Sequence, residues 1–511
     1  MTAMDTESLI RPAAGHAAAV LELCADRYSG RGTPMLADHV DLSTGEPERW
    51  EGRVLSNLAR QQHFLRVLVG LDALGESRFG DAADSWIGHA LPAVTDEGGL
   101  LHWGGHSTYA LDEDAPLPGN HELKCVYPFY DYLHRVDPEA TRRFVEAFWQ
   151  RHIWDWSTLL FNRHGDYGPW DRSRVWEEAE FLAGPLPIVD QTALSFINTG
   201  SDLIYAAAEL FRLQGEERAL RWAANLVSRY DQIRHPRTGL GAYQFNHREP
   251  CRVRESFKPP LGDRPDVNEA TVLTSGTIVT RGQRAALTFL NLYSQLAEDR
   301  GRAFLDVALR DLRALWEHSW DAASGCFHPV LYDGQRLREQ DSEQRGYCPP
   351  AKLVKVPADG GALLTWARAC RVTGDEDLLE MAAALAGAMG WTGDGGPVPL
   401  PAPGEKLPDP VSAVFGLLDL HEATGEPAYL EAAASLGQAL AAERTRDGLL
   451  AEDPSAAGAA SQDNVLALAL LHCAAARDGR RHLVPPYYPG GNPWDPKIVV
   501  RTVGPRDRAD A

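Results

Sequence analysis

The feature that most constrains this fold is a recurring pair of helical segments joined by a short turn containing glycine. Apolar residues recur at helical spacing from Leu194 to Leu213 and, after a break at Gly215, from Ala219 to Ile233. Connectors such as Val372-Thr-Gly-Asp375 place glycine where a helix ends in a left-handed cap, followed by an acidic residue that favours the next helix start. Each such pair predicts a helical hairpin.

Similar pairs recur about seven times along the chain, at intervals typical of repeat folds. Lone helical segments near Ala17 and Leu466 can close a ring by pairing with each other. We therefore predict an all-α fold, an (α/α) toroid or barrel of about six to seven helical hairpins with small β insertions. An open solenoid would show the same periodicity. The further pairs are Val54–Ala73 with a partner after Gly75, a hairpin from Leu123 that turns at Asp137-Pro138, Ala285–Leu296 with Phe304–Trp316, Ala362–Cys370 with Leu378–Met389, and Val411–His421 with Tyr429–Leu440.

We expect a single catalytic domain over residues 1–511, with its site chiefly from residues 100–270 and an irregular C-terminal tail over residues 485–511. The formal net charge of −21 disfavours a nucleic-acid partner, because that affinity comes from many phosphate contacts. The first residues lack the basic and then apolar pattern of a secretory signal, no stretch is apolar enough to cross a membrane, and seven cysteines without paired spacing suit reduced thiols. These features predict a cytoplasmic protein with no membrane partner.

Between residues 100 and 190 the helical pattern is interrupted by segments rich in glycine and proline, and such loops often carry function. Two imidazoles and one carboxylate hold a divalent transition metal while leaving positions open for substrate. We choose His106, Glu122 and His164 as the ligands, although any one histidine could instead be a hydrogen-bonded structural residue. The best candidate ligands expected outside regular helix in this stretch are His102, His106, His121, Glu122, His152 and His164.

Cations and aromatic residues gather in the same stretch. Arg163 directly precedes His164, and Lys124 and Arg172 are near in sequence to the predicted ligands. Cations concentrated in an acidic protein predict an anionic substrate, although a solvated rim would give the same pattern. Flat aromatic faces can stack against sugar rings. The residues predicted to bind substrate are Lys124, Trp103, Trp170, Arg172 and Tyr243.

The segments Gly105-His106, Asn120-His-Glu-Leu-Lys124 and Asn162-Arg-His164 resemble the second family of polysaccharide lyases, the transition-metal-dependent pectate lyases, and related pectate-lyase-like bacterial proteins. The resemblance implies an (α/α) barrel that binds manganese, nickel or cobalt, or else calcium, through His106, Glu122 and His164. It also implies that Arg163 is the base. The implied substrate is an anionic oligosaccharide containing uronic acid, with oligogalacturonate first, cleaved by β-elimination.

Elementary chemistry agrees with this activity, because the proton beside a uronate carboxylate is barely acidic until a cation neutralises that carboxylate. Arginine, however, stays protonated in ordinary proteins. If Arg163 only stabilises negative charge, then Tyr109, Tyr167 or a metal-bound hydroxide would have to take the proton.

Three other functions fit the same pattern. Glycoside hydrolysis needs two carboxylates across a cleft, for which the chain offers Asp166, Asp171, Asp190 and Glu177. A sugar epimerase would use histidines as acid and base. A carbohydrate-binding toroid with structural histidines would bind no metal and catalyse nothing.

Overall fold

A computed structural model describes ten stretches of the chain. The description covers residues 6–117, 119–176, 179–184, 189–190, 193–247, 253–344, 348–391, 408–451, 459–462 and 464–490. The chain forms two compact units. The first takes in residues 1–147, 166–170 and 410–502, and the second residues 148–165, 171–409 and 503–511.

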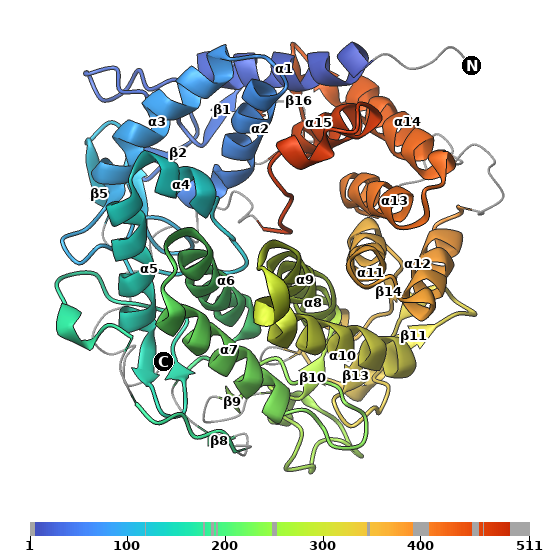
Figure 1. Cartoon of the computed structure of the whole chain (residues 1–511). Helices are drawn as coiled ribbons and strands as arrows, with labels where there is room; N and C mark the ends of the chain where they lie inside the picture. The colour runs from blue at the N-terminus through green and yellow to red at the C-terminus, as the bar shows by residue number, and fades with distance from the viewer. Residues whose placement is uncertain are drawn as a thin grey trace. The chain divides into compact units, whose positions relative to one another are not determined.

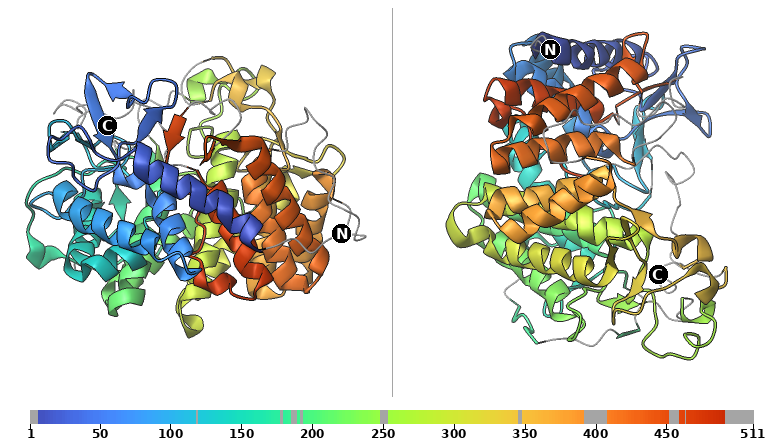
Figure 2. Two further views of the ribbon diagram at one scale, coloured as in Figure 1. Left: turned by 90° about the horizontal axis from the view of Figure 1, so that it is seen from above. Right: turned by 90° about the vertical axis from the view of Figure 1, so that its right-hand side faces the viewer.

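In the first unit, the first and last of the described α-helices pack together. Helix α1 (Thr6–Leu23) packs along α15 (Leu466–Arg477), as expected for the two lone end segments (Figure 1). Helix α15 also contacts α2, α13 and α14, and Figure 2 shows α13, α14 and α15 lying alongside one another. The paired helices are α2 (Gln62–Ala73) with α3 (Arg78–Val94), and α13 (Pro410–Thr424) with α14 (Pro427–Arg444); α4 (Tyr130–Val136) contacts α3 and is joined at Asp137 to α5 (Pro138–His152).

In the second unit, the first helices of successive hairpins pack against one another: α6 against α9, and α9 against α11. The predicted turns are present, since Gly215 and Gly374 end their helices in the left-handed region with φ of 73° and 68°. The pairs are α6 (Ile197–Gln214) with α7 (Glu217–Gln232), α9 (Ala286–Gln295) with α10 (Arg302–Ser319), and α11 (Gly360–Thr373) with α12 (Glu376–Ala388); α8 (Ser275–Ile278) leads through a π-helical segment, Val279–Ala285, into α9.

Short strands connect the helices. Among the strands that the structure describes, every strand pair is antiparallel except β8 with β9. The largest sheet has the order β2 (Arg49–Trp50), β3 (Arg53–Ser56), β4 (Thr108–Ala110) and β5 (Ala115–Leu117), with Ser56 opposite Tyr109. The others are β11 (Trp320–Asp321), β12 (Cys326–Phe327) and β14 (Val356–Pro357), and the pairs β1 (His39–Asp41) with β17 (Ala459–Ser461), β6 (Ile153–Asp155) with β7 (Leu160–Phe161), β8 (Val189–Asp190) with β9 (Asn246–His247), β10 (Val272–Leu273) with β13 (Val330–Leu331), and β15 (Thr445–Arg446) with β16 (Leu449–Leu450).

These elements confirm the predicted fold class, since the described chain consists of helical hairpins with small β insertions and its first and last helices pair. Two boundaries were wrong. The helix expected from Val54 begins at Gln62, because residues Arg53–Ser56 pair as β3, and the helix expected from Leu123 begins at Tyr130.

The expectation of a single domain stays a prediction. Of the expected irregular tail, residues 485–490 contain neither helix nor strand, and residues 491–511 lie outside the described residues. Among the described helices, none is both long and apolar enough to span a membrane.

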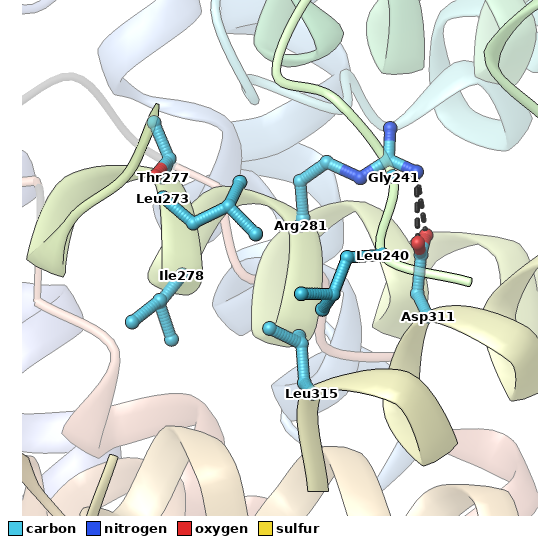
Figure 3. Close-up of a pocket in the computed structure, with 8 residues that line it drawn as sticks. All are labelled: Leu240, Gly241, Leu273, Thr277, Ile278, Arg281, Asp311 and Leu315. Atoms are coloured by element: carbon cyan, nitrogen blue, oxygen red, sulfur yellow. Dashed lines mark hydrogen bonds and ion pairs between the residues drawn. The ribbon is translucent and has the colours of Figure 1, made fainter. Parts of the chain in front are cut away.

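A buried ionic cluster lies beside a small cavity of the second unit (Figure 3). Arg281 donates to both carboxylate oxygens of Asp311, at 2.8 and 3.0 Å, and Arg234 donates to one of them at 2.8 Å. Burial alone raises the pKa of Asp311, but the two guanidiniums outweigh it and hold that pKa below its ordinary value. The cavity, of about 10 Å³, has room for about one water molecule and is too small for a sugar. It is lined by Leu240, Gly241, Leu273, Thr277, Ile278, Arg281, Asp311 and Leu315.

Asp311→Asn is expected to destabilise the protein by about 3–5 kcal/mol, because it leaves two buried guanidiniums without their counter-charge. Thermal and urea unfolding measure the effect. The matched control is Asp306→Asn on the same helix, whose exposed pair with Arg302 is worth at most about 1 kcal/mol. Equal unfolding temperatures for the two variants would contradict this account of the core.

Candidate metal centre

Two loops of the first unit run side by side and carry two of the predicted ligands. Gly104 bridges Glu122 in parallel fashion, and the Gly105 N–H donates to the Glu122 carbonyl at 2.9 Å. A β-carbon at Gly104, whose φ is 95°, would lie 2.0 Å from that carbonyl oxygen. A β-carbon at Gly105 would lie 2.4 Å from Oε2 of Glu122. The two adjacent glycines therefore permit the close approach of the Glu122 segment.

The carboxylate of Glu122 is fully buried and lies between a histidine and a lysine. Its Oε2 is 3.1 Å from Nε2 of His106, and its Oε1 is 2.8 Å from Nζ of Lys124. A buried carboxylate requires such partners, since removing its charge from water is costly. Lys124, predicted to bind substrate, thus has its ammonium on a predicted metal ligand, where it neutralises and orients the carboxylate.

The three predicted ligands come together. His106, Glu122 and His164 each offer one ligand atom, and these atoms all lie within 4.8 Å of one another. Within the described part of the chain, this is the only such group of three or more potential ligands. Two imidazoles and one buried carboxylate form a donor set that suits a divalent transition metal.

The turn that carries His164 is held by its own neighbours in the second unit. Oδ1 of Asn162 accepts the His164 N–H at 2.9 Å, and the Arg163 N–H donates to the Leu194 carbonyl at 3.1 Å. The Arg163 guanidinium carbon lies 5.6 Å from the centre of the Phe196 ring, a cation–π contact. The backbone and this ring together direct the Arg163 side chain.

The remaining histidines of the stretch have structural contacts. Nε2 of His121 lies 3.1 Å from the indole nitrogen of Trp103, which donates to it, and both side chains are fully buried. The His102 ring stacks on Tyr167 with centroids 4.1 Å apart, and the buried His152 contacts the Asn162 carbonyl through Nδ1 at 2.9 Å.

The two candidate tyrosine bases are engaged elsewhere. The Tyr109 hydroxyl donates to Asp114 at 2.8 Å, and the Tyr167 hydroxyl donates to the Leu101 carbonyl at 2.9 Å. Burial raises the pKa of both hydroxyls, and for Tyr109 the bond to Asp114 raises it further. A raised pKa keeps a phenol protonated, and a protonated phenol cannot take up a proton from the substrate. These contacts therefore disfavour both tyrosines as the base.

The residues predicted to bind sugar have different environments. Trp103 lies in the core, which does not fit a role in stacking against substrate. Trp170 is partly exposed and donates to the Gly98 carbonyl at 2.8 Å, and Tyr243 is partly exposed with its ring 5.1 Å from that of Phe196. Arg172 is exposed in a short 3₁₀ helix, Arg172–Arg174.

The carboxylates considered for hydrolysis have local partners where they are described. Asp166 accepts from the Asn120 side chain at 3.3 Å, and Asp171 accepts the Ser173 N–H at 3.0 Å. Glu177 and the side chain of Asp190 lie outside the described residues.

Sequence reasoning missed Asn57. Its side-chain amide donates to the Gly104 carbonyl at 2.9 Å, and its carbonyl oxygen accepts the Gly104 N–H at 3.0 Å. The only local signal is a run of four polar residues, Arg60 to His63, which follows Asn57 closely and leads into a largely apolar helix.

Comparison with known proteins identifies the family of this chain. Residues 33–495 match the family described as "Periplasmic pectate lyase". The chain is 30% identical over 387 residues to the pectate disaccharide-lyase of Dickeya dadantii (strain 3937), covering 68% of this chain and 69% of that protein. The chain therefore belongs to this pectate lyase family, which supports a lyase activity. The word periplasmic differs from the cytoplasmic location predicted above, which stays a prediction.

Solved structures are more distantly similar. Cellobiose 2-epimerase from Bacillus thermoamylovorans B4167 matches with 11% identity and a TM-score of 0.46, covering 92% of this chain and 99% of that chain. A family 76 glycoside hydrolase from a bovine Bacteroides thetaiotaomicron strain matches with 14% identity and a TM-score of 0.44, covering 93% and 79%. No activity is transferred from either protein to this chain.

Gly105→Ala is expected to leave the fold intact and to weaken metal binding about tenfold or more, because the new methyl group displaces the tip of Glu122. Calorimetric titration with Mn²⁺ measures the affinity, and circular dichroism checks the fold. The control, Gly88→Ala, adds the same methyl group to an exposed helix position with open space around it. Unchanged Mn²⁺ affinity in Gly105→Ala would contradict the position assigned to Glu122.

Proposed function

We propose that this protein is a metal-dependent lyase that cleaves an oligosaccharide containing uronic acid, with oligogalacturonate as the leading substrate, by β-elimination. The observation that carries the proposal is the meeting of His106, Glu122 and His164 in a chain of the pectate lyase family. The name of the Dickeya dadantii relative, a pectate disaccharide-lyase, supports the choice of galacturonate.

In the reaction a base takes the C5 proton beside the uronate carboxylate, the C–H electrons form a C4–C5 double bond, and the C4–O bond breaks. The released sugar oxygen takes up a proton from solvent. Manganese, nickel or cobalt, when bound by the three ligands, supplies a Lewis acid that neutralises the uronate carboxylate. Glu122 serves as a ligand in its ionised form, which the ammonium of Lys124 stabilises.

We assign to Arg163 the role of the base that takes the C5 proton. It directly precedes the ligand His164, and the alternative tyrosine bases have raised pKa values and other hydrogen-bond partners. To act as the base, Arg163 takes the C5 proton in its neutral form, and the guanidinium so formed stabilises the charge that develops on the uronate. Partly exposed Trp170 and Tyr243 are the aromatic residues we assign to substrate binding.

The direct test is the absorbance at about 235 nm of a panel of oligouronides, because the unsaturated product absorbs there. The protein is assayed with Mn²⁺ and then with a chelator. A rise that requires metal is the expected result, and the responding substrate identifies the uronate. New reducing ends without a rise in absorbance would contradict elimination and favour hydrolysis.

His164→Ala is expected to lose bound metal and activity together, whereas Arg163→Ala is expected to keep the metal and lose turnover by about 10²-fold or more. Elemental analysis of the purified variants and the absorbance assay measure the two properties separately. His102→Ala, a nearby histidine outside the ligand group, is the control and should retain its metal. A His164→Ala protein with undiminished metal content would refute the ligand assignment.

A further inference from the structure

Helix α2 and the turn before it bury polar side chains in the first unit. Asn57, Gln62 and Arg66 are each at most 2% exposed. Buried amides and guanidiniums are costly unless they are hydrogen-bonded. An amphipathic helix normally turns such residues toward water, so their partners indicate why these positions are polar.

Asn57 binds the loop that carries His106. Besides its two hydrogen bonds with Gly104, its amide lies 3.4 Å from the Ser107 carbonyl. Asn57 is itself held, because its N–H donates to the buried carboxylate of Asp38 at 2.7 Å, which also accepts from Gln61 at 3.0 Å. The backbone on both sides of His106 is therefore tied to one buried amide.

Gln62 and Arg66 bind the segment that follows Glu122. Oε1 of Gln62 accepts the Phe129 N–H at 2.8 Å, and Nη2 of Arg66 donates to the Tyr127 carbonyl at 2.8 Å. The guanidinium of Arg66 also lies 5.1 Å from the centre of the Phe129 ring. These contacts come from one face of one helix.

The segment after Glu122 has a backbone that needs such support. Cys125 and Tyr127 have φ of 53° and 49°, in the left-handed region that residues other than glycine adopt at a cost. A conformation of this kind persists only where surrounding contacts determine it. The hydrogen bond from Arg66 ends on the carbonyl of Tyr127, one of these two residues.

We infer that Asn57, Gln62 and Arg66 are positioning residues that hold the His106 and Glu122 loops in the arrangement that binds the metal. The inference rests on the proposed function, since it concerns the same metal centre. None of the three is a proposed ligand or base. Their effect is to fix the two loops before the metal arrives, so that binding does not have to order them.

The test compares Asn57→Ala with Asn464→Ala by calorimetric titration with Mn²⁺, supported by thermal unfolding. Asn464 is the matched control, a buried asparagine of the same unit that donates to the Leu450 carbonyl and accepts the Leu466 N–H. Asn57→Ala should weaken Mn²⁺ binding by the folded protein about 10–100-fold, whereas Asn464→Ala should only lower the unfolding temperature.

Arg66→Met provides a second arm on the Glu122 side and should also weaken Mn²⁺ binding while the protein remains folded. Equal Mn²⁺ affinity in Asn57→Ala, Arg66→Met and the unsubstituted protein, or equal weakening in Asn464→Ala, would overturn the positioning role alone. Failure of the unsubstituted protein to bind Mn²⁺ would instead overturn the proposed function together with this inference.

Discussion

The interaction on which the candidate centre depends is the burial of the Glu122 carboxylate between His106 and Lys124. A buried carboxylate is stable only when it is paired with opposite charges, hydrogen-bond donors or a metal ion. These partners then occupy fixed positions around it. One carboxylate oxygen lies near the lysine and the other near the histidine. Glu122 is thereby held as a potential ligand, with a negative charge that can be shared with a metal.

The backbone of the neighbouring loop makes the burial of Glu122 possible. Gly104 and Gly105 leave no side chain in the space that the Glu122 carbonyl and carboxylate occupy, and Asn57 ties the same loop to the start of α2. The helical hairpins supply the rigid support, because their apolar faces pack together while loops at the helix ends carry the polar residues. How well ordered such a site is depends on the hydrogen bonds that anchor its loops.

The parts of the fold predicted from sequence were those with a local signal. The hairpin of α6 and α7 follows from helical periodicity and from Gly215 at the turn, and the ligand types follow from their concentration in irregular segments. The predicted start of α2 was wrong because Arg53–Ser56 is a strand, which pairs with β2 across the turn at Glu51 and Gly52 and with β4 more than fifty residues away. The core position of Trp103 also depends on a separate segment, since its indole donates to His121. The contact of Lys124 with Glu122 lies within one segment, but a lysine near a predicted ligand equally suits a substrate-binding cation. Asn57 was missed because an isolated asparagine does not reveal which distant loop it will bind.

The measurement that tests the central claim most directly is anomalous X-ray diffraction from crystals soaked in Mn²⁺, recorded near the manganese absorption edge. The account predicts one strong peak within bonding distance of His106, Glu122 and His164, about 2.0–2.3 Å from the ligand atoms. A protein crystallised with Mn²⁺ that shows no peak at these three side chains, or one held by other residues, would contradict it.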